Sequence, residues 1–262
     1  MTENFSGKVA IITGGASGIG RETAVQLAKA GCHIIVADIN LDKATEVAEG
    51  LFTDSIAFKL DVSSEENWID VMTCAKETFG GLDILINCAG IGFADDFEDM
   101  PLDHWNAMIS VNLTGTFLGC QKAIKLMKES GKPAVITNIS SIAGLVGGED
   151  IAGYSASKGG VTMLTKSVAL YCAGKGYNIR CNSIHPTYVD TEMLDPIADA
   201  FDSRQVMLDG MATQVPIGRV AIPSDIASTI LFLCSPDAGM ITGHQMVIDG
   251  GQLAGIPAQH TV

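Results

Sequence analysis

Short runs of apolar and β-branched residues alternate with longer segments of helical periodicity along almost the whole chain. The runs are continuously apolar, which is the pattern of parallel strands buried on both faces. The strands that they predict are 8–13, 33–37, 55–60, 82–87, 133–139, 178–184 and 245–248. The helices predicted between them are near 18–30, 41–50, 64–79, 101–129, 152–173 and 223–234. The intervening lengths suit right-handed crossovers, so we expect a doubly wound α/β fold: a seven-stranded parallel sheet with helices on both faces.

One stretch breaks this rhythm, because residues 190–218 form a long segment without a predicted strand. Insertions of this kind after a late strand often form a lid over the site. No linker, repeat or low-complexity segment interrupts the rest of the sequence. We therefore expect residues 1–262 to form one domain with a substrate lid at about 190–218.

A glycine-rich turn, TGGASGIG at 13–20, lies between the first predicted strand and the first predicted helix. In that order the turn presents free backbone N–H groups at a helix N-terminus, which together with the helix dipole attract a pyrophosphate. Gly14 would allow the tight turn, Gly18 the approach of phosphate, and Gly20 close packing of helix on strand. The spacing G-x-x-x-G-x-G differs from the commoner G-x-G-x-x-G, yet its context predicts a Rossmann-like dinucleotide-binding domain.

The second predicted strand, 33–37, is followed directly by Asp38. A carboxylate there is placed to accept hydrogen bonds from the adenine-ribose hydroxyls, and it would repel a 2′-phosphate. A cation in the glycine turn or just after the strand would offset that repulsion, but those positions hold small residues and Ile39. Because Asp38 has no cationic neighbour in the sequence, we expect NAD and not NADP as the cofactor.

Tyr154 and Lys158 lie four residues apart in a predicted helix, so their side chains share one face. A phenol has an ordinary pKa of about 10 and is a poor base at neutral pH. A neighbouring ammonium and the positive ring of an oxidised nicotinamide would lower that pKa and make Tyr154 a general acid/base. Such a pair alone is usually a solvated helix face, so its meaning depends on what lies nearby.

Ser140 and Ser141 follow the predicted strand 133–139, at the edge of the sheet where ligands of open parallel sheets bind. Successive strand residues point to opposite faces, so the two hydroxyls cannot both reach a site there. The pattern leaves either serine as the candidate, with a turn-forming hydroxyl as the alternative.

Taken together, these motifs resemble the short-chain dehydrogenase/reductase family, in its short single-domain branch. The resemblance runs from about Gly7 to Gly251. It rests on the glycine turn at 13–20, the sequence NCAG at 87–90, Ser141, and the pair Tyr154-x-x-x-Lys158.

The resemblance assigns roles to the four expected catalytic residues, Ser141, Tyr154, Lys158 and Asn112. It implies that Tyr154 is the acid/base and that Ser141, thirteen residues earlier, hydrogen-bonds the substrate oxygen. Lys158 lowers the pKa of the tyrosine and binds the nicotinamide ribose, while Asn112 supports a water relay to that lysine. No metal is expected, because Ser141 and Tyr154 together polarise the oxygen that a metal would otherwise hold.

The family also suggests where the cofactor lies along the chain. Asp61 and Val62 resemble the pair that contacts adenine, and the Val189 backbone and Thr191 hydroxyl resemble the groups that bind the carboxamide. Thr187 stands where the family usually has glycine, so the local backbone geometry is the open point there. The residues expected to contact the cofactor are Gly14, Ser17, Gly18, Ile19, Gly20, Asp38, Ile39, Asp61, Val62, Asn87, Ala89, Gly90, Tyr154, Lys158, Pro186, Val189 and Thr191.

Met193, Ile197 and Phe201 recur at a spacing of four, which predicts one apolar face of a lid helix. An adaptable surface of methionine and aromatic residues suits a lipophilic alcohol or ketone; the alternative is a lid helix that merely packs on the domain. No Arg or Lys occurs from 181 to 203, so a phosphorylated or carboxylate substrate finds no clamp there. The residues expected to line the substrate pocket are Phe93, Ala143, Tyr188, Met193, Ile197 and Phe201.

Composition narrows the possible partners. Sixteen basic residues against thirty acidic ones give a net charge of −14, which disfavours nucleic acid and anionic membranes as partners. No apolar run approaches the about 18 residues of a membrane span, and residues 1–6 do not resemble a secretory signal. Seven scattered cysteines without a C-x-x-C pair favour reduced thiols over disulfides or a zinc site. We therefore expect a cytoplasmic protein.

The function expected from these observations is that of an NAD-dependent oxidoreductase that interconverts a secondary alcohol and its ketone. A hydrophobic cyclic or hydroxysteroid-like substrate is favoured, with a sugar or polyol as the alternative. A 3-ketoacyl carrier-protein reductase is disfavoured by Asp38 and by the negative net charge. A non-catalytic NAD-binding protein is disfavoured because the complete set of catalytic residues is present.

The resemblance also implies a homotetramer. Residues 241–251 resemble the edge strand and turn that pair subunits in the family, and an open apolar edge would invite aggregation. The predicted helices 101–129 and 152–173 carry more apolar residues than one buried face needs. Those interpreted as a second interface are Leu113, Phe117, Cys120, Leu164, Val168 and Tyr171, with a place in the subunit core as the alternative.

Overall fold

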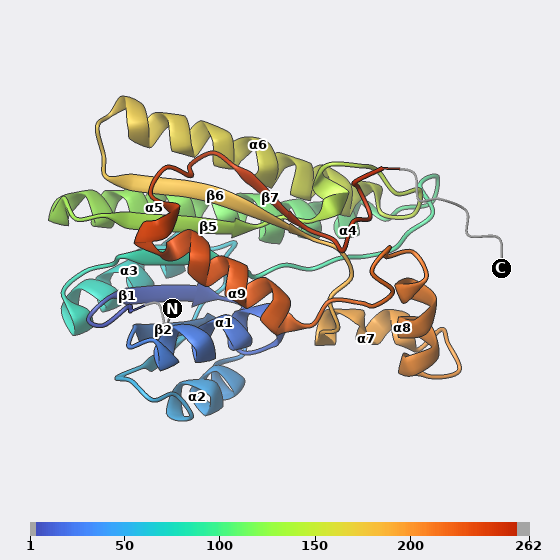
Figure 1. Ribbon diagram of the computed structural model, residues 1–262, viewed down its shortest axis with the longest axis horizontal. Coiled ribbons are helices and arrows are strands. Elements are labelled where there is room, and N and C mark those ends of the chain that lie inside the picture. The colour runs from blue at the N-terminus through green and yellow to red at the C-terminus, as the bar shows by residue number, and fades with distance from the viewer. Residues whose placement is uncertain (1–3, 256–262) are drawn as a thin grey trace.

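The structure, a computed structural model, describes residues 4–255. Within them, seven strands form one parallel sheet in the order β3-β2-β1-β4-β5-β6-β7 (Figure 1). The strands are β1 (Val9–Thr13), β2 (His33–Asp38), β3 (Ile56–Lys59), β4 (Ile84–Asn87), β5 (Ala134–Ile139), β6 (Ile179–Pro186) and β7 (Gln245–Ile248). The expected doubly wound, Rossmann-like α/β fold is confirmed.

Helices cover both faces of this sheet (Figure 1). Helices α1 (Gly18–Lys29), α2 (Leu41–Glu49) and α9 (Pro223–Cys234) contribute to the apolar core on one face. The other face is covered by α3 (Glu65–Phe79), α5 (Gly115–Ser130) and α6 (Ala152–Gly174). The predicted helix 101–129 consists of α4 (Leu102–Met108), the wider π-helical turn η1 (Ile109–Thr114) and α5.

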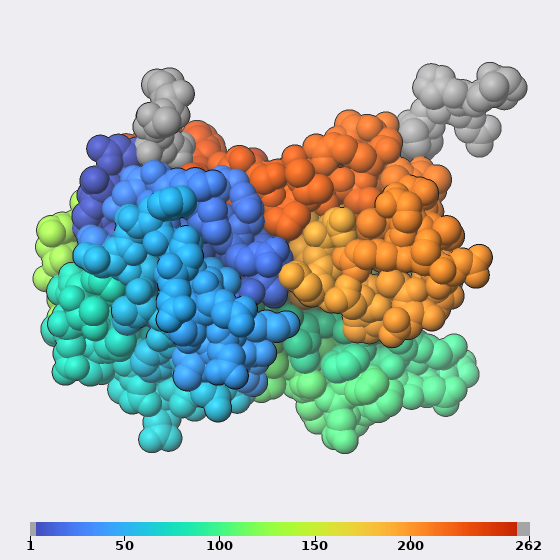
Figure 2. Space-filling model, turned by 90° about the horizontal axis from the view of Figure 1, so that it is seen from below, coloured from blue at the N-terminus to red at the C-terminus, as the bar shows by residue number. Residues whose placement is uncertain are grey.

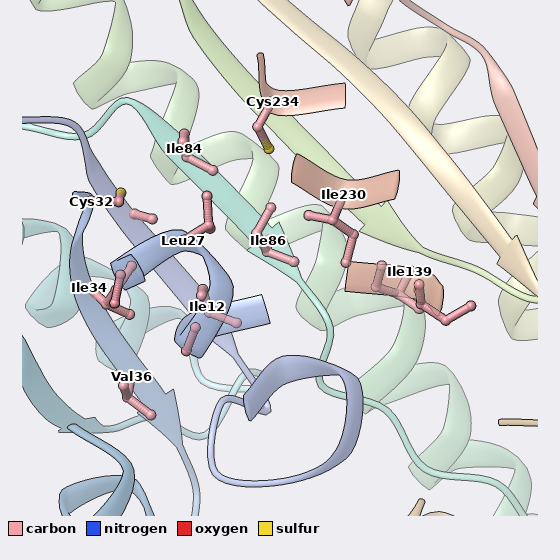
Figure 3. Close-up of a cluster of buried hydrophobic side chains, with 14 of the residues drawn as sticks. Ile12, Leu27, Cys32, Ile34, Val36, Ile84, Ile86, Ile139, Ile230 and Cys234 are labelled. Carbon is pink, nitrogen blue, oxygen red and sulfur yellow. The ribbon is translucent and has the colours of Figure 1, made fainter. Parts of the chain in front are cut away.

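Burial on both faces explains why the strands are continuously apolar. Ile12 lies in the core beneath α1 and α9, whereas its neighbour Ile11 lies in the core beneath α3 and α5, and both are fully buried. Figure 3 shows the first of these cores, where Leu27 of α1 and Ile230 of α9 meet the strand residues. Burial of each such side chain stabilises the folded state by about 1.5–3 kcal/mol relative to leaving it exposed to water.

Local signals set where several helices begin and end. The side chain of Asn40 accepts a hydrogen bond from the Lys43 amide at the start of α2, and Ser64 does the same at the start of α3. Such caps satisfy backbone donors that have no partner inside the helix. Gly80 and Gly131 adopt left-handed backbone geometry just after α3 and α5, which ends those helices.

One apolar residue that the sequence assigned to a helix-pairing surface lies instead in the subunit core. Cys120 is 1% exposed, so its assignment to an interface is wrong. It faces inward because α5 buries one side against the sheet. Val168 packs against the core beneath α3 and α5 but is only partly buried, so its assignment stays a prediction. Phe117 and Tyr171 are exposed, as the interface interpretation requires.

The segment 190–218, called the lid segment below, contains no strand but two short turns of helix and α8 (Arg204–Ala212). The turns are η3 (Glu192–Leu194) and α7 (Asp195–Ala198). In Figure 2 its gold and orange surface meets the blue surface where α1 begins. No helix within residues 4–255 is long and apolar enough to cross a membrane.

The expected lid helix with Met193, Ile197 and Phe201 on one face is wrong, because α7 ends at Ala198. Pro196 has no amide hydrogen, so it can begin a helix but cannot continue one from the preceding turn. Ser203 then caps a separate helix, α8, by accepting from the Val206 amide.

Candidate active site

The strand order reverses between β1 and β4, which creates a crevice at their carboxyl ends. Hydrogen bonds of Thr13, the last residue of β1, hold the ends of these two strands together. Its hydroxyl accepts from the amides of Cys88 and Ala89, just after β4, at 3.0 Å each. Gly14 has a φ of +64°, and a Cβ there would lie 2.9 Å from Ala89 Cα. Only glycine therefore allows the turn after β1 to pass this close to the loop after β4.

The start of α1 sits directly against the same turn. A Cβ on Gly20 would lie 2.1 Å from the Gly14 carbonyl oxygen, so close packing of helix on strand requires glycine there. Ser17 precedes the helix and makes no side-chain cap, while Ile19 packs against the core. Because no side chain of the turn caps this helix end, its amides can donate to an anion from elsewhere in the chain or from a ligand, and the Gly18 amide donates to Glu192.

Asp38 closes the edge of this crevice at the end of β2. Its Oδ2 accepts from the Ala16 amide at 3.1 Å, and its Oδ1 accepts from the Asn40 amide at 3.0 Å. The structure corrects the statement that Asp38 has no cationic neighbour, because Lys59 is its partner on β3. That lysine lines an open hollow of about 470 Å³ together with residues 39–42, including the exposed Ile39. Strand order, which brings the two together, is not visible in the local sequence.

Tyr154 and Lys158 project from the first turns of α6 into the crevice. The Lys158 ammonium lies 5.6 Å from the centroid of the Tyr154 ring and donates a hydrogen bond of 2.9 Å to the Ile139 carbonyl at the end of β5. It is 3% exposed. Gly92 lies over the phenol ring, since a Cβ there would be 3.3 Å from it.

The structure separates the two candidate serines. Ser140 turns away from the crevice, and its hydroxyl donates to the Lys158 carbonyl at 2.9 Å. Ser141 hydrogen-bonds the Tyr154 phenol and also accepts from the Ala143 amide at 3.1 Å. Ser141 is therefore the hydroxyl that shares the crevice with Tyr154.

Asn112 lies in the π-helical turn η1 and is buried beside the same site. Its Oδ1 accepts from the Ile91 amide, and its Nδ2 donates to the Ile91 carbonyl and to the Ser157 hydroxyl, all at 2.9 Å. Single π turns inside α-helices are frequent at functional sites. Here the wider turn directs an amide side chain towards the loop after β4.

Burial governs the titration of both central groups. It raises the pKa of Tyr154, against the lowering effect of the hydrogen bond from Ser141. The lowered pKa expected for Tyr154 depends on the positive ring of oxidised nicotinamide as well as on Lys158, and it stays a prediction. Burial also lowers the pKa of Lys158 to about 8, because the charged form loses its water.

His185 lies behind Ser141 and positions its backbone. Its Nδ1 lies 2.9 Å from the Ser141 carbonyl and its Nε2 lies 2.8 Å from the Ser183 hydroxyl. Burial lowers the pKa of the imidazole, so the ring is neutral. Because a carbonyl only accepts, the neutral ring donates from Nδ1 and holds the backbone of Ser141 in place.

Other expected cofactor residues are placed by their own local bonds. Asp61 closes a turn by accepting from the Ser63 amide at 2.9 Å, and Val62 packs where a Cβ on Gly115 would lie. Asn87 props the sheet interior by donating to Asn138 at 2.8 Å.

The strand β6 leads from Pro186 into the segment expected to hold the carboxamide. No non-glycine residue within 4–255 has a positive φ, so Thr187 needs no glycine-like backbone. Its amide donates to the Ile248 carbonyl at 3.1 Å. Val189 pairs with Ala221 in an isolated bridge, and the methyl group of Thr191 lies 3.0 Å from the position of a Cβ on Gly18.

Met193, one of the expected substrate residues, reaches from the lid segment towards Gly90 beside the catalytic groups. A Cβ on Gly90 would lie 4.0 Å from the Met193 methyl group and 3.3 Å from both Lys158 Nζ and Asn112 Oδ1. Phe93 instead stacks on His104, with ring centroids 4.1 Å apart.

The rest of the expected pocket lies on separate segments. Tyr188 donates its hydroxyl to Gln214 near the end of the lid segment at 3.0 Å, and Ala143 is buried beside Ser141. Ile197 and Phe201 are partly exposed on the lid segment.

These features fit a dinucleotide. The α1 N-terminus offers amides for phosphate, Asp38 offers a carboxylate for the ribose, and Gly90 leaves beside Lys158 a space that any side chain would fill. The crevice therefore has groups that fit a nicotinamide cofactor.

Comparisons with known proteins find related oxidoreductases. A family model described as enoyl-(acyl carrier protein) reductase matches residues 14–252. An NADP-dependent (R)-specific alcohol dehydrogenase from Lentilactobacillus kefiri is 37% identical, over 97% of this chain and 100% of that protein. A cyclohexanol dehydrogenase from Acinetobacter sp. is 39% identical, over 95% of this chain and 96% of its own. A 3-beta-hydroxysteroid dehydrogenase from Comamonas testosteroni is 36% identical, over 97% and 98%.

A solved structure shows the same fold. The crystal structure of a short-chain type dehydrogenase/reductase from Mycobacterium marinum gives a TM-score of 0.89 at 31% identity, covering 96% of this chain and 98% of that one. Fold and site thus define an oxidoreductase that uses a nicotinamide cofactor. The chain belongs to the short-chain dehydrogenase/reductase family, as its motifs predicted.

Proposed function

We propose that this protein is an NAD-dependent dehydrogenase that interconverts a secondary alcohol and its ketone, with a hydrophobic cyclic or hydroxysteroid-like substrate. The observation that carries the proposal is the meeting of Ser141, Tyr154 and Lys158 in one crevice beside the α1 glycine turn. The alcohol, cyclohexanol and hydroxysteroid dehydrogenases among its relatives support the reaction and the substrate class.

When bound, the nicotinamide ring supplies a hydride acceptor for alcohol oxidation and a donor for ketone reduction. The Ser141 hydroxyl holds the substrate oxygen, and Tyr154 takes or returns its proton. Because the pKa of Lys158 is about 8, this side chain is mostly protonated at neutral pH and stabilises the phenolate of Tyr154. Asn112, fixed by Ile91 and Ser157, supports the water relay that returns protons to Lys158.

The preference for NAD rests on Asp38. Two backbone amides hold its carboxylate at the end of β2, where it would bind the ribose hydroxyls and repel a 2′-phosphate. Lys59 on the neighbouring strand favours the competing possibility, NADP, and the relative from Lentilactobacillus kefiri is NADP-dependent. We favour NAD for two reasons. Asp38 lies at the end of β2 itself, and Lys59 does not neutralise its charge, because Lys59 makes no ion pair within the described residues.

The test is a turnover assay with the purified chain, NAD or NADP, and a panel of alcohols. We expect NAD reduction with cyclohexanol and with a 3-hydroxysteroid, and slower reduction with a sugar alcohol such as sorbitol. Faster reduction of NADP would overturn the cofactor assignment. Binding of NADH without turnover of any secondary alcohol would indicate a non-catalytic NAD-binding protein.

A further inference from the structure

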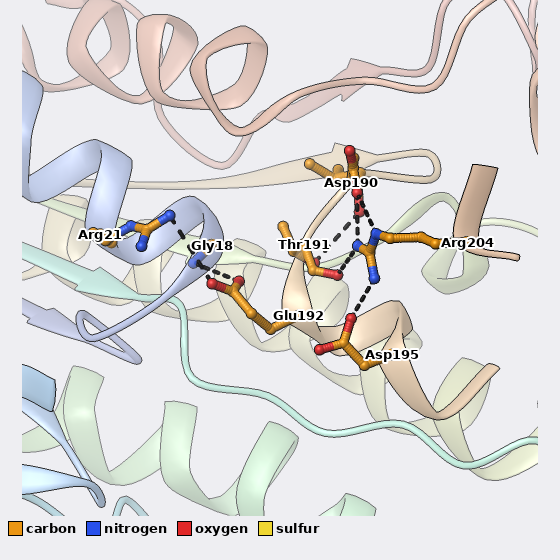
Figure 4. A network of polar contacts seen from close by, with 8 residues as sticks. Gly18, Arg21, Asp190, Thr191, Glu192, Asp195 and Arg204 are labelled. Atoms are coloured by element: carbon orange, nitrogen blue, oxygen red, sulfur yellow. Dashed lines mark hydrogen bonds and ion pairs between the residues drawn. The ribbon is translucent and has the colours of Figure 1, made fainter. Parts of the chain in front are cut away.

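A carboxylate from the lid segment occupies the N-terminus of α1. Glu192, the first residue of η3, accepts a hydrogen bond of 3.1 Å from the Gly18 amide through Oε2. Its other oxygen, Oε1, lies 3.9 Å from Nη2 of Arg21 on α1 (Figure 4). The two partners in the hydrogen bond are 174 residues apart in the chain.

This helix end has no anion of its own. The first turn of α1 contains no acidic residue, and its N-cap, Ser17, makes no side-chain cap. Glu192 therefore supplies both the hydrogen-bond acceptor and the negative charge that a helix N-terminus favours. A phosphate oxygen of a dinucleotide would offer the same chemistry to the same amide.

Glu192 is not a loose side chain on a mobile tether, because Arg204 holds the backbone around it. The guanidinium of Arg204 donates to Asp190 at 2.6 Å and to the Thr191 carbonyl at 2.7 Å, and it also pairs with Asp195 (Figure 4). These bonds fix residues 190–195 as one unit. The contact of Glu192 with Gly18 anchors that unit to α1.

We propose that Glu192 competes with the cofactor pyrophosphate for the α1 N-terminus and so sets the affinity of the chain for NAD. This inference rests on the proposed NAD binding. Two anions cannot share the Gly18 amide without strong repulsion, so the carboxylate moves aside when the nucleotide binds. Cofactor binding thereby releases the lid segment from α1.

The structure provides a destination for the displaced carboxylate. An open hollow of about 340 Å³ lies beside Glu192, and Arg21 and Arg204 both line it. Arg21 already lies within ion-pair distance of Glu192. Its side chain is half-exposed, so it has room to move with the displaced carboxylate. The displaced charge would remain paired.

The substitution Glu192→Gln tests the competition, because it keeps the size of the side chain and removes its charge. We expect the variant to bind ADP and NADH about threefold to tenfold more tightly than wild type, as one helix-end charge is worth about that factor. Binding of ADP is measured by calorimetry and that of NADH by fluorescence, neither of which requires catalysis. Adenosine, which has no phosphate, should bind wild type and variant equally.

Glu22→Gln is the matched control. Glu22 also lies on α1 but bonds to Gln26 one turn further along, so its loss of charge should leave ADP affinity within about twofold of wild type. Equal or weaker binding of ADP by Glu192→Gln would overturn the inference, and so would an equal gain in Glu22→Gln. Failure of wild type to bind ADP and NADH at all would instead overturn the proposed function.

Discussion

Tyr154 combines a buried phenol, a hydrogen bond from Ser141 and the nearby Lys158 ammonium. The substitution Tyr154→Phe keeps the ring and its packing and removes only the proton-transferring hydroxyl. We expect kcat to fall by about 100-fold to 10,000-fold, while the dissociation constant for NADH stays within about twofold. Turnover assays and NADH titrations measure the two effects. Retention of more than a few per cent of the turnover would show that another group transfers the proton.

Lys158 predicts a dependence of stability on pH. Its pKa is about 8 in the folded chain and 10.5 ordinarily, so between these values the unfolded chain holds a proton that the folded chain has lost. This group therefore makes folding more favourable as the pH rises through that window. Lys158→Met has no such group, so we expect its stability not to show this contribution. The free energy of unfolding of wild type minus that of the variant, measured with urea, should therefore increase as the pH rises through the window. A constant difference between them would mean that Lys158 stays charged when buried.

Asp38 predicts the cofactor preference. In Asp38→Ala the ribose hydrogen bonds and the repulsion of a 2′-phosphate both disappear, so kcat/KM with NAD should fall about tenfold or more and the ratio of NAD to NADP should narrow. Asp42→Ala, which removes a charge of the same sign from the hollow lined by residues 39–42 and Lys59, is the control. An unchanged ratio in Asp38→Ala would show that another group, such as Lys59, reads the ribose.

Among the elements, those buried on both faces could be predicted well from the sequence. The strand bounds differ from the predicted ones by two residues or fewer, because a parallel strand under two helix layers must be apolar throughout. Asn40 and Ser64, which cap α2 and α3, are residue types that favour helix starts, but the predicted bounds did not rest on them. The π-helical turn at Ile109–Thr114 had no such signal, since its residues are as apolar and helix-compatible as their neighbours.

Site residues could be proposed from the sequence where the local geometry needs one residue type. Properties that depend on neighbours in three dimensions could not. The glycines of the turn and Asp38 were proposed from their places at the ends of predicted strands, and the Tyr154–Lys158 pair from its spacing together with the neighbouring motifs. Lys59 was missed because the pairing of β2 with β3 is a long-range property. The raised pKa of Tyr154 was missed because burial depends on the packed loop after β4, not on the helix face.

Within the lid segment, one cation, Arg204, connects three separate residues. Arg204 joins Asp190, Thr191 and Asp195, so Arg204→Gln should speed amide hydrogen exchange in residues 190–212. The global free energy of unfolding should change little, because partly exposed ion pairs contribute little to it. Arg219→Gln, which breaks a pair with Asp225 of α9 outside the segment, is the control. Unchanged exchange in Arg204→Gln would mean that apolar packing alone orders the segment.

At the scale of the whole molecule, the exposed apolar surface favours assembly. Leu170 on α6 is 74% exposed and Tyr171 beside it is half-exposed, which is costly for a helix facing water. We propose a homotetramer, and light scattering should give a mass near four times 27.4 kDa. Leu170→Glu should reduce that mass, whereas Phe52→Glu, on an exposed loop after α2, should not. A wild-type mass near one chain would refute the assembly.

The position of β1 in the sheet has a consequence for how the chain is made. The ribosome releases this strand first, yet it lies in the middle of the sheet and pairs with β2 on one side and β4 on the other. The edge that later meets β4 therefore stays open while the two intervening strand and helix units are synthesised. Pairings of such long sequence separation form slowly, because the connecting loop must close before any contact rewards it. Until β4 emerges, the nascent chain exposes an apolar strand edge, which favours aggregation at this stage of synthesis.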